Sequence, residues 1–183
     1  MEVGPYDPRS IANLMLEEAH RHGTPITNLA LQKLLYFAHA LFLVERKRPL
    51  VSGNFEAWTF GPVHPVVYEA FKSAGGQPIT TKASGINVAT GARVQLSSPA
   101  NPEVTRHVER VLLSYGRLTP GRLVDISHAK GAPWDFVVNK GRTAVAFGLR
   151  ISDDVILERF KYHKVSVSEA PAAGEPGEDA PLA

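Results

Sequence analysis

The spacing of apolar positions predicts a chain made mainly of α-helices. Apolar residues recur every three or four positions in several segments, and a proline or a capping residue precedes most of these segments. The predicted helices cover residues 8–22, 28–46, 65–71, 102–115 and 120–129, a short segment from Pro133, and 152–162. The helix at 28–46 is apolar almost all round, interrupted mainly by Gln32, Lys33 and His39. A helix of this kind belongs in the middle of a domain.

Short β segments are predicted at two places. Residues 55–60 form an aromatic-rich strand, which the following Gly-Pro pair ends. Residues 86–88 and 94–96 flank a Thr-Gly turn and predict a β-hairpin. Together the elements predict a mostly α fold of the α+β class, with about seven helices packed around a central apolar helix and a small antiparallel β element.

Composition divides the chain into a body and a tail. Residues 165–183 contain three prolines, two glycines and four carboxylates, but no aromatic residue and no Lys or Arg. Such a segment cannot bury enough apolar surface to offset its ordering entropy, so we expect a disordered acidic tail. Residues 1–164 then form one domain with 20 Lys and Arg against 14 Asp and Glu. This moderately basic body either attracts anionic partners or simply keeps the protein in solution.

Several classes of protein are excluded by the sequence. The 183 residues include no cysteine, which excludes disulfides and thiolate metal sites. No apolar run reaches the ~18 residues of a membrane-spanning helix, and no secretory signal precedes the first helix. We therefore expect a cytoplasmic protein without a membrane partner. Because the histidines form no ligand set and no nucleophile elbow or phosphate loop is present, we expect no metal, no cofactor and no enzymatic activity.

A polar stripe on the helix at 28–46 is the first candidate for partner binding. Gln32, Tyr36 and His39 lie at positions i, i+4 and i+7, on one face of an otherwise apolar helix. One interpretation is a solvent-facing edge or a buried hydrogen-bonded network. The other is the floor of a groove that offers hydrogen bonds to a bound partner.

Two segments that combine aromatic residues with proline are the second candidate. A tryptophan beside a proline either anchors a core or forms an aromatic wall for a partner. Of the two tryptophans, we expect Trp58 to lie in the core and Trp134 to lie at the partner site. Because the aromatic-wall interpretation stays open for both segments, the candidate partner-binding residues taken from them are Trp58, Gly61, Pro62, Val63, His128 and Trp134.

Three motifs make the chain resemble a known family. The segments LQKLLYFAH at 31–39, EAWTFGPV at 56–63 and VY at 67–68, with a later SH…PW segment at 127–134, resemble the Panacea domain. That family is also described as SocA-like antitoxins and as GepA-type phage-associated proteins. The resemblance covers roughly residues 8–162. It departs from the family just before the PW pair, where relatives often carry an acidic residue and this chain has Lys-Gly-Ala.

The resemblance implies a type II antitoxin, a protein that binds and neutralises a co-encoded protein toxin. The SocA-like branch is further associated with proteolytic adaptors that deliver the toxin to the ClpXP protease. The alternative is a nucleic-acid-binding regulator of a mobile genetic element, because a short turn joins the helices at 8–22 and 28–46 and the body is basic. The second helix, however, lacks an exposed polar face for reading base edges, which disfavours nucleic acid as a partner.

Overall fold

The elements follow each other in the order that the helical pattern predicts. The structure, a computed structural model, describes residues 4–143 and 149–164. Within these residues it contains seven α-helices, five short strands and two 3₁₀ helices, so the fold is mostly α with a small β element. In chain order the elements are α1 (Pro8–Arg21), α2 (Asn28–Arg46), β1 (Phe55–Trp58), β2 (Gly61–Val63), α3 (Pro65–Phe71), η1 (Lys72–Ala74), β3 (Ser84–Ile86), β4 (Arg93–Gln95), α4 (Pro102–Tyr115), α5 (Pro120–Ser127), α6 (Pro133–Thr143), β5 (Arg150–Ile151), α7 (Asp153–Arg159) and η2 (Phe160–His163).

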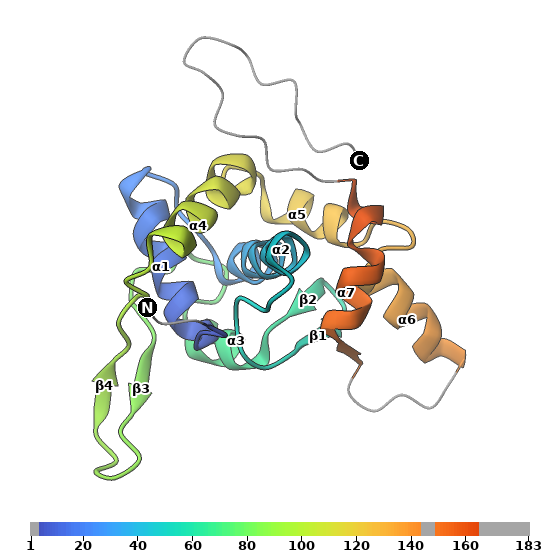
Figure 1. Cartoon of the computed structure of the whole chain (residues 1–183). Coiled ribbons are helices and arrows are strands. Elements are labelled where there is room, and N and C mark those ends of the chain that lie inside the picture. The colour runs from blue at the N-terminus through green and yellow to red at the C-terminus, as the bar shows by residue number, and fades with distance from the viewer. Residues whose placement is uncertain (1–3, 144–148, 165–183) are drawn as a thin grey trace.

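Helix α2 runs through the middle of the molecule (Figure 1). Helices α1, α4, α5 and α7 and strand β2 pack around it. Of its 19 residues, 15 are buried. Thr27 caps its start by accepting a hydrogen bond from the Ala30 N–H group, and Lys47 ends it in the left-handed conformation with φ 56°. The predicted central helix is therefore confirmed, and its surface forms the core of the domain.

Capping side chains set where most helices begin. Each cap lies before the first turn and accepts a hydrogen bond from a backbone N–H group two or three positions later. Such caps are Asp7 for α1, Asn101 for α4, Thr119 for α5 and Ser152 for α7. A proline with its fixed φ follows the first three of them. The predicted starts of these four helices are confirmed, whereas the last helix changes to 3₁₀ geometry after Arg159.

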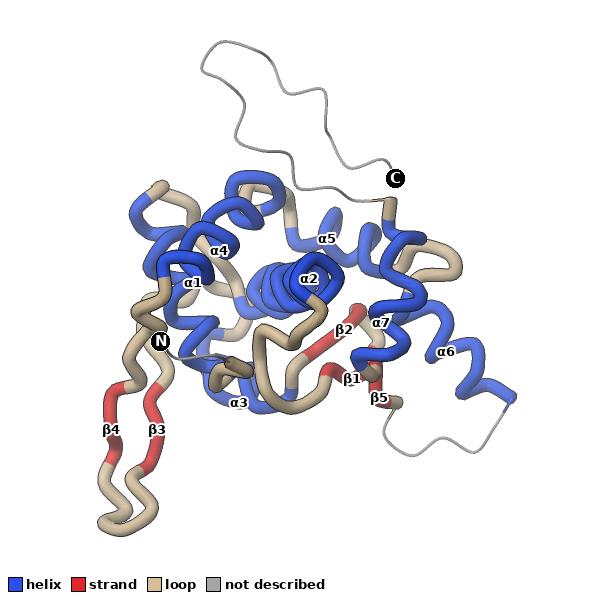
Figure 2. Tube along the Cα trace, in the orientation of Figure 1, coloured by secondary structure: helices blue, strands red, loops and turns tan. Residues whose placement is uncertain are grey.

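A three-stranded antiparallel sheet lies beside α2 in the strand order β2-β1-β5 (Figure 2). The prediction that Gly61 and Pro62 end the β structure is wrong. The chain turns back over Thr59 and Phe60, and β2 pairs with β1 so that Gly61 lies opposite Trp58. Gly61 has a φ of 96°, a conformation that side-chain-bearing residues rarely adopt. Pro62 lacks an N–H group but is tolerated because β2 is an edge strand.

Strands β3 and β4 form a hairpin that projects from the body as an arm (Figures 1 and 2). The predicted hairpin is confirmed, but its first strand ends at Ile86 rather than at residue 88. The reason is Asn87, whose side-chain oxygen accepts hydrogen bonds from two backbone N–H groups of the tip and starts the turn there.

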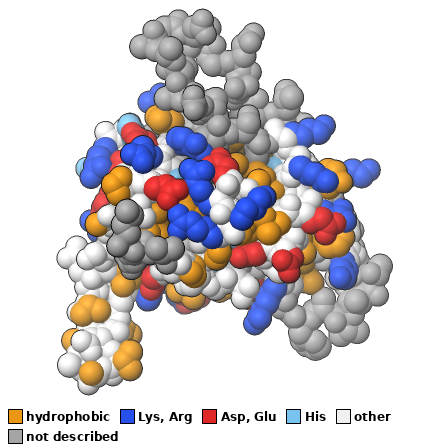
Figure 3. Space-filling model, viewed as in Figure 1, with side chains coloured by type: hydrophobic (Ala, Val, Ile, Leu, Met, Phe, Trp, Pro, Cys, Tyr) orange, Lys and Arg blue, Asp and Glu red, His pale blue; other side chains and the backbone are white. Residues whose placement is uncertain are grey.

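The hairpin arm is fixed to the body at its base. The fully buried side chain of Asn13 on α1 binds both legs, exchanging hydrogen bonds with the backbone of Ala83 and donating to the Leu96 carbonyl. Beyond this clamp, every residue from 86 to 95 is exposed, and only Arg93 among them is charged. The arm accordingly shows almost none of the blue and red of charged side chains in Figure 3.

The predicted disordered tail, residues 165–183, lies outside the described residues. Among the helices of the described part of the chain, none combines the length and the apolar character needed to cross a membrane.

Candidate functional site

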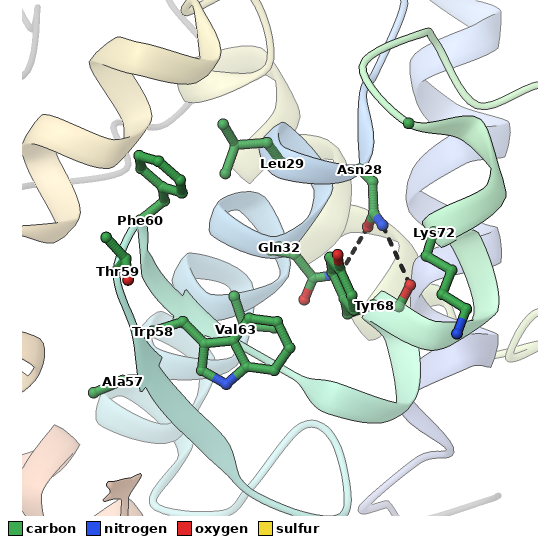
Figure 4. Close-up of a pocket in the computed structure, with 11 residues that line it drawn as sticks. Asn28, Leu29, Gln32, Ala57, Trp58, Thr59, Phe60, Val63, Tyr68 and Lys72 are labelled. Carbon is green, nitrogen blue, oxygen red and sulfur yellow. Dashed lines mark hydrogen bonds between the residues drawn. The ribbon is translucent and has the colours of Figure 1, made fainter.

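A groove opens where the β1–β2 turn, the start of α2 and helix α3 meet (Figure 4). Its volume is about 640 Å³. Its lining comes from three separate parts of the chain that the central helix and the sheet bring together. The lining residues are Asn28, Leu29 and Gln32 from α2, Ala57, Trp58, Thr59, Phe60 and Val63 from the strand pair, and Tyr68, Lys72 and Gly75 from α3 and the turn after it.

Two aromatic side chains form an exposed wall of the groove. Phe60 at the tip of the turn is 64% exposed, and Trp58 is 36% exposed. The Trp58 indole N–H donates to the Glu56 carboxylate at 2.8 Å, and its ring meets Tyr68 edge-on with 4.9 Å between centroids. The expectation that Trp58 lies in the core is wrong because side chains alternate along β1: Phe55 faces the core, and Trp58 points to the opposite face.

The polar floor of the groove is saturated with internal hydrogen bonds. The Gln32 amide oxygen accepts from the His64 backbone N–H at 3.0 Å, and its amide nitrogen donates to Asn28 at 2.9 Å. Asn28 in turn donates to the Tyr68 carbonyl, as the dashed lines in Figure 4 show. Because these polar groups already have partners, the groove offers a partner mainly apolar surface. Gln32 lies at the predicted position in a groove, but its hydrogen-bonding groups are used within the protein.

The other two residues of the stripe lie inside the protein. Tyr36 is fully buried, and its hydroxyl lies 3.0 Å from His163 Nε2. His39 is also buried, accepting from the Val51 N–H at Nδ1 and bonding Asp153 through Nε2 at 2.9 Å. The expectation that Tyr36 and His39 form a partner-facing floor is therefore corrected. Their polar groups join α2 to η2, α7 and the loop before β1, which is the alternative of a buried network.

Burial sets the charge states in this network. Burial raises the pKa of Tyr36 far above its ordinary range and lowers the pKa of His163 to about 4. Both groups are therefore neutral near pH 7, as a hydrogen bond between them in the core requires.

Trp134 supports the aromatic wall from behind. Its indole N–H donates to the Trp58 carbonyl at 2.8 Å, and its ring stacks on His128 with 3.7 Å between centroids. Trp134 is itself partly buried against the core. Burial lowers the pKa of His128, and the nearby Lys33 charge lowers it further. Trp58, which was expected in the core, thus lines the groove, and Trp134 holds the backbone of the strand that carries Trp58.

Lys33 is a site residue that the sequence reasoning missed. It is fully buried on α2, and its ammonium nitrogen donates to the Pro62 carbonyl at 2.8 Å. Burial lowers the pKa of Lys33 to about 7, and no carboxylate of the described residues forms an ion pair with it. Its sequence signal was a single lysine flanked by leucines in an otherwise apolar helix.

The described part of the chain holds no metal cluster, and the helix pair that the sequence offered as a DNA reader does not fit that role. Within residues 4–143 and 149–164, no three histidine or carboxylate side chains lie close enough to share an ion. Helix α2 is buried on nearly every side. Because a recognition helix must expose one face to a DNA groove, the pair α1–α2 does not form a helix-turn-helix reader.

Comparison with known proteins identifies similar sequences. Residues 31–135 match the family described as "Antitoxin SocA-like, Panacea domain". A relative named "Antitoxin SocA", from Caulobacter vibrioides (strain NA1000 / CB15N), is 49% identical over 175 residues. This alignment covers 96% of the present chain and 93% of the relative. No solved structure matches the chain. The family match begins on α2 and ends on α6, so it includes most of the groove and the residues that support its wall.

Proposed function

Because the chain belongs to the SocA-like antitoxins with a Panacea domain, we propose that it binds and neutralises a cognate protein toxin through the groove beside Trp58 and Phe60. The antitoxin role is supported by the name of a relative that aligns over nearly the whole chain. The contact site is supported by the geometry of the groove.

The observation that carries the choice of site is the exposure of two large aromatic side chains on a fixed turn. Aromatic residues beside a groove are the usual anchors of protein interfaces, where a few residues carry most of the binding energy. The Phe60 side chain leaves most of its surface in water, which is unfavourable unless a partner covers it. The turn needs little ordering on binding because its strands pair and Trp134 holds the Trp58 carbonyl.

The remaining site residues divide into two groups under this proposal. Gln32 and Val63 line the groove with Trp58, and they either contact the toxin or shape the surface to which it binds. Six others act indirectly: Gly61, Pro62, His128 and Trp134 support the wall, whereas Tyr36 and His39 fix α2 against its neighbours.

The test is neutralisation by variants of the wall. Phe60→Ala and the double variant Trp58→Ala/Phe60→Ala are co-expressed with the protein encoded by the adjacent reading frame, followed by growth measurement and pull-down. We expect loss of neutralisation, since truncating a central anchor costs about 2 kcal/mol or more of binding. The melting temperature of Phe60→Ala is expected to stay close to that of the wild type because the ring is mostly exposed.

Leu113→Ala is the matched control, because Leu113 is 56% exposed on α4 and lies outside the groove. It should neutralise the toxin as the wild type does. Full neutralisation by the double wall variant would rule out the groove as the contact site.

We further propose that the antitoxin acts as an adaptor that delivers the toxin to the ClpXP protease. The support for this step is the family resemblance and the acidic segment 165–183, whose length corresponds to a reach of about 22–26 Å if it is flexible. Deleting this segment should leave toxin binding unchanged and slow toxin degradation if the segment tethers the protease. Degradation at the full rate would place any protease contact on the body.

A further inference from the structure

Lys33 lies directly beneath the turn that carries the aromatic wall. Its nitrogen is 2.8 Å from the Pro62 carbonyl oxygen, two residues after Phe60. A Cβ atom added to Gly61 would lie 2.4 Å from Ser127 Oγ and 2.9 Å from Lys33 Cε. The backbone of β2 is thus seated without spare room on side chains of α2 and α5.

Side chains of the body hold two backbone carbonyl groups of the strands on either side of this turn. On one strand, Trp134 binds the Trp58 carbonyl, and on the other, Lys33 binds the Pro62 carbonyl. Between these two anchors the chain turns outward at Thr59 and Phe60, both of which are exposed. The direction of the Phe60 ring therefore depends on how firmly both carbonyls are held.

The surroundings of the Lys33 nitrogen suit a neutral amine better than an ammonium ion. From β2 it meets the Pro62 carbonyl, and Ser127 of α5, which lies close to Gly61 of the same strand, already donates its hydroxyl to the Val124 carbonyl. The titratable group that faces it is His128, itself influenced by Asp125 and Asp135. An ammonium has three donors, and the described residues give it a single hydrogen-bond acceptor, so protonation leaves buried donors unpaired.

We propose that Lys33 is a positioning residue for the groove, whose buried amine holds the Pro62 carbonyl and thereby the aromatic wall, and that protonation of this amine releases the hold. This role deepens the proposed function, on which it rests. The held turn keeps Lys33 neutral, and the released turn lets the ammonium reach water. Acidification therefore favours release, and the wall should be best ordered above neutral pH.

The first test uses the free chain and needs no toxin. Amide hydrogen exchange of residues 56–63 is measured between pH 6 and pH 8 and corrected for the intrinsic pH dependence of exchange. With a held-state pKa near 7 and an ordinary value in the released state, protection should fall about tenfold from pH 8 to pH 6. Methionine has an apolar side chain of similar length to lysine. In Lys33→Met, the pH dependence of the protection should therefore vanish.

Lys130→Met provides the matched control, because Lys130 is an exposed lysine in the loop after α5. It should keep the dependence of the wild type. A flat wild-type profile would overturn the role of Lys33, even if Lys33→Met failed to fold. If protection changed equally with pH in the wild type and in Lys33→Met, the titrating group would be His128, and the proposed role of Lys33 would again be overturned.

The second test measures affinity for the protein encoded by the adjacent reading frame at pH 8 and pH 6. The wild type should lose at least threefold more affinity on acidification than Lys33→Met does. Equal losses would overturn the link between Lys33 and binding. Absence of binding by the wild type at both pH values would contradict the proposed function instead, and the exchange measurement would still decide whether Lys33 holds the turn.

Discussion

Replacing Lys33 by methionine should stabilise the protein at neutral pH, although it removes a hydrogen bond. Lys33 is fully buried with a pKa of about 7, compared with the ordinary value of 10.5. The folded state thus favours the neutral amine, whereas the unfolded chain holds the proton up to about pH 10. The free energy of unfolding should therefore rise with pH between about 7 and 10.5, and Lys33 should add no further pH dependence below that window.

The magnitude follows from the size of the pKa difference. One pKa unit corresponds to about 1.4 kcal/mol, so the wild type should gain about 4 kcal/mol relative to Lys33→Met between pH 6 and pH 10. The lost hydrogen bond to Pro62 costs the variant about 1 kcal/mol at every pH. Because the unfolded lysine is still mostly protonated at pH 10, Lys33→Met should be about 4 kcal/mol more stable than the wild type at pH 6, and about equal to it in stability at pH 10.

Urea unfolding followed by circular dichroism at pH 6, 7, 8, 9 and 10 measures this difference. Comparing the two proteins at each pH cancels the titration of the other groups. The Lys130→Met variant measures how much the free energy of unfolding changes when an exposed lysine is lost. Two parallel stability profiles, or a methionine variant that is less stable throughout, would refute the reasoning that desolvation dominates at this position.

Three further predictions concern other parts of the molecule. Gly61→Ala should lower the free energy of unfolding by about 2 kcal/mol in a urea titration, because its φ of 96° is strained for alanine and the new Cβ meets Ser127. His163, with a pKa lowered to about 4, releases its proton in the folded state while the unfolded chain binds one below pH 6.5, so stability is lost as pH falls. The wild type should therefore lose about 3 kcal/mol more than His163→Gln does between pH 7 and pH 4 in the same titration. Deleting residues 165–183 should leave the melting temperature within about a degree of the wild type, as measured by differential scanning fluorimetry.

The parts of the fold that the sequence predicted are those whose signals are local. Caps such as Asp7 and Asn101 act within three residues of their own position, and the nearly uniform apolar surface of α2 reports its burial directly. Strand β5 was missed because two residues carry no periodicity, and it exists only by pairing with β1. Where structure depends on a partner far along the chain, local patterns do not reveal it.

The candidate site shows the same limit. The helical spacing correctly placed Gln32, Tyr36 and His39 on one face, but their burial depends on partners such as His163, which follows Tyr36 by 127 residues. Trp58 was assigned to the core because the sequence does not show which face of β1 the core covers. Lys33 was passed over because a lysine is rarely fully buried, and its acceptor is a backbone carbonyl that has no sequence signature.

The hairpin arm offers a practical handle on the protein. Its clamp at Asn13 lies at the base, its tip is exposed from residue 86 to residue 95, and none of the groove-lining residues belongs to it. Insertions are best tolerated at exposed loop tips of this kind. A fluorophore or an affinity peptide placed at Thr90-Gly91 should therefore allow the antitoxin to be followed or captured in living cells. Such a label would leave the aromatic wall accessible to a binding partner.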